Sequence, residues 1–220
     1  MNVKPGKISK KLEIGKEIFN ASLHQKMTIE AINSLALEKK NRVLELGHGC
    51  CDHLDYLMEQ AEELRYFGME VSEKMLQSAL VNNLKFVNAS KALFLKYDGE
   101  RIPYVHNMFD KILSINTIFY WKNPVEYINE LYRVLKPGGT CVIAFSDTTF
   151  LEQLSVVGGD REIYKFYGLD DVTELLVSCE ANIFDVSVKN ERVKTKSGNW
   201  ENKEYHVITL KKKAIPRYLR

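Results

Sequence analysis

The sequence has few cysteines and no long apolar run, which limits the classes of protein it can represent. Its four cysteines, at positions 50, 51, 141 and 179, do not form the framework of a disulfide-rich secreted protein. The amino-terminal residues lack the apolar core of a signal peptide, and no apolar run is long enough to span a membrane. We therefore predict a cytoplasmic protein without a membrane span, whose thiols stay reduced.

The sequence also lacks an excess of charge. The formal net charge is +2, so general binding to nucleic acid or another polyanion is not predicted. There is no internal repeat and no low-complexity linker. With 220 residues, of which 45% are hydrophobic, the chain can bury a substantial core, and one domain is the default expectation. Nothing in the sequence indicates an oligomeric state.

Apolar runs alternate with helical patterns along most of the chain. β-like runs are predicted at 42–46, 65–71, 92–97, 110–115, 140–145, 183–193 and 204–210, and helices within 12–38 and at about 52–64, 72–87, 124–135 and 170–179. The last two β-like runs flank Ser197-Gly198-Asn199, which indicates a hairpin. This alternation predicts an α/β protein whose mostly parallel sheet is covered on both faces, with an antiparallel strand at one edge.

The most informative segment is an apolar run that leads through Glu45 into two glycines. Gly47 allows a sharp turn, and Gly49 leaves room for ligand atoms against the backbone. Glu70 ends the next apolar run, where its two carboxylate oxygens can accept both hydroxyls of a ribose. Ligands of such sheets bind beyond the carboxyl ends of the strands. We therefore expect the site in the loops that begin at Gly47, Glu70, Asp98, Asn116 and Ser146.

This combination predicts a nucleoside-containing cofactor without a phosphate. A dinucleotide favours glycine at the sixth position of the loop, where this chain has Asp52. A carboxylate there would repel a pyrophosphate that uses the same helix dipole. S-adenosylmethionine carries a ribose but no phosphate, so it fits both observations. A nicotinamide-dependent oxidoreductase is the alternative that Asp52 disfavours.

Four segments resemble the signatures of a known family. They are VLELGHGC at 43–50, FGMEVSEKML at 67–76, DGERIPY at 98–104 followed by Phe109-Asp110, and LYRVLKPGG at 131–139. In this order and spacing they resemble the class I S-adenosylmethionine-dependent methyltransferases, including the small-molecule group that contains quinone-biosynthesis methyltransferases. The resemblance implies a Rossmann-like three-layer sandwich, with a mostly parallel seven-stranded sheet and an antiparallel C-terminal edge hairpin.

The resemblance also implies a set of cofactor-binding residues: Glu45, Gly47, Gly49, Glu70, Val71, Met75, Asp98, Gly99, Asn116 and Thr117. Gly47 and Gly49 would lie against the methionine and ribose portions of the cofactor. Glu45 would help to place the methionine amino group. Glu70, where the family more often has aspartate, would bind the ribose hydroxyls.

The later loops would complete the cofactor site. Asp98 would accept a hydrogen bond from the adenine amino group, and Gly99 would leave the backbone open to the ring. Asn116 and Thr117 end the fourth predicted strand and would contact the methionine end. The chain departs from the family pattern at Cys51, where a third glycine is usual.

By the same resemblance, a methyl group would pass to a small-molecule acceptor by in-line displacement, leaving S-adenosylhomocysteine. The sulfonium is a good leaving group, so the protein mainly aligns the reactants and excludes water. A base is needed only if the acceptor must lose a proton. No residue is clearly that base, and the candidate side chains are Tyr120, His24, Tyr164 and Tyr167. A protein that binds the cofactor without catalysis is the second alternative.

His48, Cys50, Cys51 and His53 lie close together in the sequence, and histidine and cysteine are both good zinc ligands. We expect no metal, because adjacent cysteines rarely point at one ion and no second pair of ligands with suitable spacing follows.

The predicted layout is a single methyltransferase domain over residues 1–220. It has an N-terminal helical cap at 1–40, a cofactor-binding core at 41–146, a lid or substrate segment at 147–168, and a C-terminal helix and hairpin at 169–213.

Overall fold

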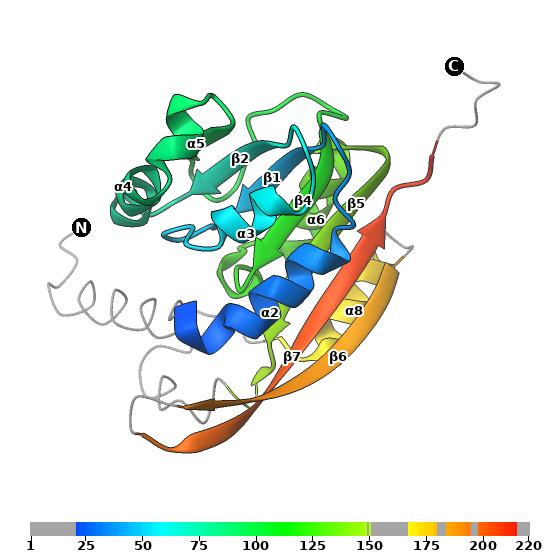
Figure 1. Cartoon of the computed structure of the whole chain (residues 1–220). Helices are drawn as coiled ribbons and strands as arrows, with labels where there is room; N and C mark the ends of the chain where they lie inside the picture. Colours follow the sequence, from blue (N-terminus) through cyan, green and yellow to red (C-terminus); the bar gives the residue numbers. More distant parts are fainter. Residues whose placement is uncertain (1–20, 149, 151–166, 180–183, 195–197, 215–220) are drawn as a thin grey trace, which may run out of the picture.

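The computed structural model describes residues 21–148, 150, 167–179, 184–194 and 198–214, and these form one seven-stranded sheet in the order β3-β2-β1-β4-β5-β7-β6 (Figure 1). The strands are β1 (Arg42–Leu46), β2 (Arg65–Glu70), β3 (Ala92–Lys96), β4 (Phe109–Ile115), β5 (Leu135–Ser146), β6 (Phe184–Lys194) and β7 (Trp200–Lys211). Strands β1 to β5 pair in parallel, and β7 pairs antiparallel with β5 and β6. The predicted sheet with its antiparallel edge hairpin is confirmed.

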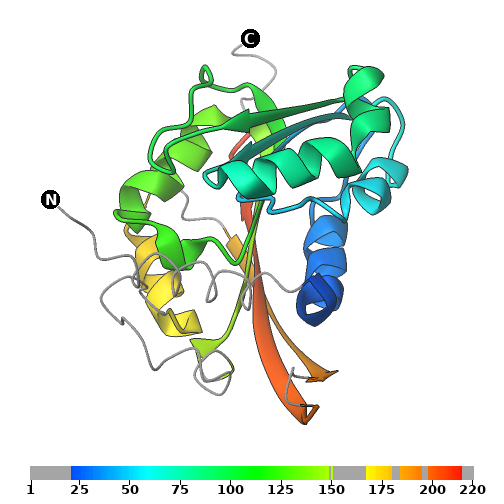
Figure 2. The same ribbon diagram turned by 90° about the vertical axis from the view of Figure 1, so that its left-hand side faces the viewer.

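Helices cover both faces of this sheet (Figure 2). They are α2 (Ala21–Ser34), α3 (Leu54–Glu59), α4 (Glu73–Asn82), α5 (Leu84–Asn88), the short 3-10 helix η1 (Ile118–Tyr120), α6 (Pro124–Val134) and α8 (Leu169–Val177). Neighbouring residues of a strand point to opposite faces. Val43 therefore packs with Met27 of α2, whereas Leu44 packs in the core that contains Leu131 of α6. We call these faces the α2 side and the α6 side, and together with the sheet they confirm the three-layer sandwich.

Side-chain hydrogen bonds explain where α4 begins and ends. Ser72 is the predicted N-cap, and its hydroxyl accepts a backbone amide of the first turn at 3.4 Å. The helix predicted over 72–87 is interrupted at Asn83, whose buried amide group donates to the carbonyls of Ala79 and Cys51. These two bonds fasten the end of α4 to the loop after β1, and α5 starts separately.

Two other predicted boundaries were wrong. The helix expected at about 52–64 is only α3, because the chain reaches helical geometry at Leu54 and leaves it after Gln60, with Glu63 at φ +56°. The segment 136–139, predicted to separate a helix from a strand, lies inside β5. Leu135 already pairs with Phe109 of β4, and the register shifts before regular pairing resumes.

The β6–β7 hairpin extends past the rest of the sheet (Figure 1). β5 pairs with β7 as far as Ser146 and Tyr205, whereas β6 and β7 stay paired as far as Lys194 and Trp200. The extension therefore projects from the carboxyl end of β5, at the edge where the ligand loops are predicted.

Parts of the predicted layout lie outside the described residues, namely 1–20 of the cap, most of the segment 147–168, and 180–183 and 195–197 of the C-terminal segment. Across the part of the chain that is described, no helix combines the length and apolarity needed to cross a membrane.

Candidate cofactor site

The loops that follow the parallel strands meet at the carboxyl edge of the sheet. The amide of Gly47 donates to the carbonyl of Met69 at 2.8 Å and joins the loop after β1 to the end of β2. The side-chain oxygen of Asn116 accepts the amide of Ser146 at 2.9 Å and joins the loops after β4 and β5. Asp98 follows β3 at the same edge. The loops therefore lie at one edge of the sheet, and their sharing of one cofactor site stays a prediction.

Gly47 forms the tight turn at the start of the first loop. Its φ is +68°, in the left-handed region that glycine adopts without strain. A Cβ at this position would lie 2.5 Å from Cγ2 of Thr117. The space beside Gly47 is therefore filled by Thr117, so this glycine brings the loops after β1 and β4 into contact.

Glu70 connects the first two loops through its carboxylate. Oε2 accepts the amide of Gly49 at 2.9 Å, and Oε1 accepts the amides of Val71 and Ser72, each at 2.9 Å. The residue is 5% exposed. A carboxylate has roughly four acceptor positions, so about one remains for a ligand hydroxyl, and not the two that the sequence prediction for both ribose hydroxyls requires.

The Asp98 loop lies beside an exposed apolar side chain. Oδ1 of Asp98 accepts the amides of Arg101 at 3.0 Å and Glu100 at 2.8 Å, and these bonds lower the pKa of its carboxyl. Val71 is 51% exposed, and a Cβ on Gly99 would lie 3.1 Å from its Cγ1. An ionised acceptor and an apolar surface thus stand together, which suits the edge and the face of a flat heterocycle.

Three more predicted residues hold the edge together from within. Asn116 is buried with φ +52°, and its side chain bonds the end of β5. Thr117 is buried and shares a short hydrogen bond with Ser114. Met75 is half-buried in α4, and its amide donates to the N-cap hydroxyl of Ser72. Their contacts to a cofactor stay predictions.

Glu45 lies beneath the glycine loop in a buried polar cluster that the sequence analysis missed. Its Oε2 lies 2.8 Å from Nε2 of His53 and accepts the hydroxyl of Tyr66 at 2.7 Å. Burial raises the pKa of the Glu45 carboxyl, but the charge and hydrogen bond of His53, together with the hydrogen bond of Tyr66 and the nearby His48, outweigh burial, so the pKa is lowered. Burial lowers the pKa of His53, but the charge and hydrogen bond of Glu45, together with the nearby Asp52, outweigh burial, so the pKa is raised. The contact could not be read from sequence, because Tyr66 reaches Glu45 only through the pairing of β1 with β2.

Cys51 occupies the third-glycine position in a strained conformation. Its φ is +54°, which explains why the family favours glycine there. The thiol is buried, with Sγ 3.2 Å from the hydroxyl of Tyr66. Burial and the nearby Glu45 carboxylate raise the pKa of this thiol well above its usual value, so it is protonated and unreactive at neutral pH.

The Glu45–His53 pair makes a pH-dependent contribution to stability. Because the pKa of His53 is raised in the folded protein, the stabilisation it brings is complete below the pKa of the unfolded chain, about 6.5. This stabilisation is lost as the pH rises through the pKa of the folded protein. Because the pKa of Glu45 is lowered in the folded protein, the stabilisation it brings is present above about pH 4.3, the pKa of the unfolded chain. This stabilisation is lost as the pH falls through the pKa of the folded protein. We expect His53→Gln, which keeps a donor but no charge, to lower Tm by about 3 °C between these two values and by less at higher pH. Calorimetric scans across the pH range measure this, and a pH-independent difference would contradict it.

The structure describes the side chains of two of the four catalytic candidates. Tyr120 lies half-buried in η1 at the end of β4, and Tyr167 is buried in the α6-side core before α8. His24 lies in α2, with no description of its side chain, and Tyr164 lies outside the described residues.

A second buried contact, missed from sequence, joins Nε2 of His206 in β7 to Oδ2 of Asp147 at 3.1 Å.

Among the residues that the structure describes, two groups of possible metal ligands come together. Glu45, Cys51 and His53 place one ligand atom each within 4.8 Å of one another, and so do Asp147, Glu204 and His206. In the first group, the hydroxyl of Tyr66 lies between Glu45 and Cys51 and satisfies both. The expectation that the protein needs no metal stays a prediction.

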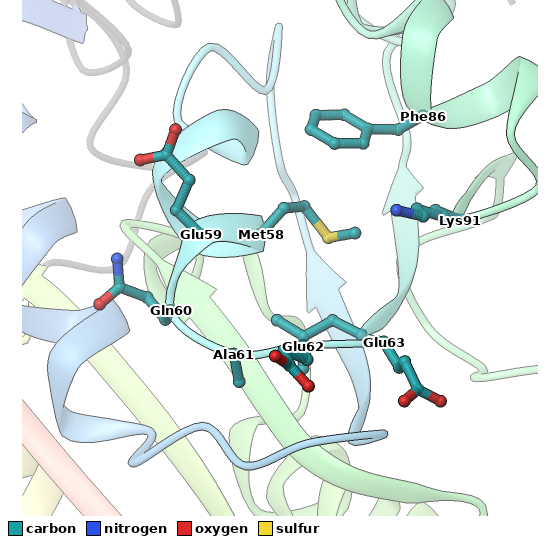
Figure 3. A pocket seen from close by; sticks show the side chains of 9 residues that line it. Met58, Glu59, Gln60, Ala61, Glu62, Glu63, Phe86 and Lys91 are labelled. Atoms are coloured by element: carbon teal, nitrogen blue, oxygen red, sulfur yellow. The ribbon is translucent and has the colours of Figure 1, made fainter.

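A hollow of about 660 Å³ lies away from these loops (Figure 3). Met58 and Phe86 contribute apolar surface, and Glu59, Glu62 and Lys91 contribute charge. The lining residues immediately precede β2 and β3, so the hollow is at the amino edge of the sheet. It is therefore separate from the edge where the cofactor loops meet.

The strand order, the glycine turn after β1 and the acids after β2 and β3 define a class I methyltransferase fold. Residues 44–143 match a family model described as a methyltransferase domain. The predicted resemblance to the class I S-adenosylmethionine-dependent methyltransferases is therefore confirmed, and residues 44–143 carry the similarity to the methyltransferase domain.

Individual proteins that are similar to this chain are also named as methyltransferases or share its fold. The uncharacterized methyltransferase YdaC of Bacillus subtilis is 27% identical over 123 residues, which are 56% of this chain and 66% of YdaC. A malonyl-[acyl-carrier protein] O-methyltransferase of Marinomonas sp. is 24% identical over 171 residues, or 76% of this chain and 62% of that protein. The chain thus spans less than two thirds of either relative. The crystal structure of YcgJ from Bacillus subtilis is similar with a TM-score of 0.66 at 13% identity, covering 87% of this chain and all of YcgJ; this likeness concerns the fold.

Proposed function

We propose that this protein transfers a methyl group from S-adenosylmethionine to a small-molecule acceptor and releases S-adenosylhomocysteine. The observation that carries the proposal is the arrangement of Glu70 and Asp98 at the ends of adjacent strands, beside the turn at Gly47. One relative is named a malonyl-[acyl-carrier protein] O-methyltransferase, and that name supports methyl transfer as the reaction.

The described residues fit this cofactor. Asp98 uses Oδ1 for backbone amides, so Oδ2 can accept the adenine amino group. Val71 offers half of its surface beside the Asp98 loop, where a purine face can pack. Glu70 keeps about one acceptor position for a ribose hydroxyl after its three backbone bonds.

The cofactor supplies a methyl group on a positively charged sulfur, which an acceptor atom can attack directly. The part played by this chain is to align the two molecules and to exclude water. Phe119 of η1 and Phe145 of β5 are buried, with ring centroids 6.4 Å apart. They close the α6 side of the edge with apolar surface. No proton transfer is assigned to a described side chain.

Calorimetric titration tests the proposal. We expect saturable binding of S-adenosylmethionine and S-adenosylhomocysteine, and none of NADH. Asp98→Ala should weaken the binding of S-adenosylhomocysteine by about tenfold, which is the effect of losing one hydrogen bond to a charged acceptor.

Glu100→Gln is the matched control for Asp98→Ala, because Glu100 is an exposed carboxylate two residues away. Its affinity should stay near that of the wild type. Failure of the wild type to bind either adenosyl ligand would refute the proposal. Binding without methyl transfer to any acceptor would instead favour a cofactor-binding protein that lacks catalysis, and saturable NADH binding would favour an oxidoreductase.

A further inference from the structure

His48, the residue between the two loop glycines, fills a gap in the sheet surface below the loop. Glu45, Gly68 and Phe94 lie side by side in register across β1, β2 and β3. A Cβ on Gly68 would lie 2.7 Å from Cδ2 of His48, and the imidazole packs edge-on against Phe94 at 5.0 Å. His48 is 4% exposed. The absent side chain of Gly68 thus provides the space in which this imidazole lies.

The buried imidazole is bonded to the next residue of the loop. Nδ1 of His48 lies 2.8 Å from the carbonyl oxygen of Gly49. A carbonyl can only accept, so Nδ1 carries the proton and donates. Among the described residues, Nε2 has no hydrogen-bond partner, which is consistent with an unprotonated nitrogen. Burial lowers the pKa of His48, which agrees with a neutral ring at neutral pH.

This bond controls the orientation of one peptide group. The amide of Cys51 donates to the carbonyl of His48 at 3.0 Å and closes a turn around Gly49 and Cys50. Gly49 has φ +58° and Cys50 a negative φ, the pattern of a type II′ turn. The alternative type I′ turn needs positive φ at both residues and turns the central peptide over. The imidazole donor stabilises the first arrangement, because only there does the Gly49 carbonyl point towards it.

The other end of this peptide then faces away from the protein interior. The C=O and N–H of a trans peptide point in opposite directions. With the Gly49 carbonyl directed inward at His48, the N–H of Cys50 is directed outward. The amide of Gly49 itself is already bonded to Glu70. The loop therefore offers a ligand the Cys50 amide, in an orientation that depends on His48.

We propose that His48 is a positioning residue that holds the Gly49–Cys50 peptide so that the Cys50 amide binds the carboxylate of the cofactor's methionine portion. The inference rests on the proposed function, because it requires an adenosyl amino acid as the ligand. It assigns to His48 a role in recognising one end of that ligand, through the peptide it orients and without a direct contact of its own.

Two ligands and two variants separate this role from a general effect on folding. S-adenosylhomocysteine carries the carboxylate, and 5′-methylthioadenosine lacks it. His48→Asn keeps an N–H donor close to the position of Nδ1, whereas His48→Leu keeps bulk without a donor. We expect the leucine variant to bind S-adenosylhomocysteine about tenfold more weakly and 5′-methylthioadenosine within about twofold of the wild type. The asparagine variant should bind both ligands nearly as the wild type does.

Phe94→Leu is the matched control, because it disturbs the same packing without removing the bond to Gly49. It should lower Tm and leave the ratio of the two affinities unchanged. If His48→Leu does not fold, His48→Gln, whose N–H lies near the position of Nε2, takes its place with the same expectation. Equal losses for both ligands, or no loss for S-adenosylhomocysteine, would overturn the inference. A wild type that binds neither ligand would instead refute the proposed function.

Discussion

Replacing Glu70 with alanine is expected to abolish measurable binding of S-adenosylhomocysteine and to lower the free energy of unfolding by about 3 kcal/mol. The buried carboxylate accepts three backbone amides, from Gly49, Val71 and Ser72. Alanine leaves these donors unpaired, at about 1 kcal/mol or more each, and it disconnects the loops after β1 and β2. Calorimetric titration and denaturant unfolding measure the two effects.

Two substitutions serve as controls for Glu70→Ala. Glu70→Asp keeps the charge but is one methylene shorter, so it cannot reach both loops, and we expect an intermediate loss of affinity of about tenfold. Glu73→Gln changes an exposed carboxylate at the start of α4 and should stay within about twofold of the wild type. If Glu70→Ala bound S-adenosylhomocysteine as tightly as Glu73→Gln does, the role of Glu70 in holding the loops and the ribose would be refuted.

Gly47→Ala is expected to lower the free energy of unfolding by about 3 kcal/mol and to weaken the binding of S-adenosylhomocysteine by about a hundredfold. Alanine at φ +68° costs about 1 kcal/mol, and its Cβ would lie 2.5 Å from Cγ2 of Thr117. To relieve that contact, the loops after β1 and β4 must separate, which moves the backbone that faces the cofactor.

Another glycine of the chain provides a control that separates the backbone strain of alanine at positive φ from the steric contact with Thr117. Gly198 has φ +88° in the β6–β7 connection, and a Cβ there would meet nothing within 4 Å. Gly198→Ala should therefore cost about 1 kcal/mol and leave affinity unchanged. The double variant Gly47→Ala, Thr117→Ser removes Cγ2 and should recover most of the affinity. Equal losses for the single and double variants would show that Thr117 is not the obstacle.

Much of the cofactor edge was predictable, because it depends on local patterns and on one rule of topology. A parallel sheet places the carboxyl ends of its strands at a common edge. Finding strands that end before Gly47, after Glu70 and before Asp98 was therefore enough to predict that these residues share a site. The apolar runs that mark those strands are short and bounded by turn residues, which makes their ends readable.

The contacts beneath the loop were not predictable in the same way. Tyr66 and Glu45 are far apart in the sequence, and they meet because β1 pairs with β2 in one particular register. Gly68 lies inside the predicted strand 65–71, and its importance appears only when His48 packs over it. A signal did exist, since glycine inside a predicted strand often marks a close approach by another group. It did not identify the group that approaches.

By itself, the sequence determined the alternation of strands and helices, the edge of the sheet that carries the ligand loops, and the residue types that point to an adenosyl cofactor. These follow from hydrophobic periodicity, glycine turns and carboxylates at strand ends, all of which are local in the chain. Only the tertiary structure decided how His48, Glu45 and Glu70 hold those loops, because strand register and side-chain packing bring together residues that no spacing in the sequence connects.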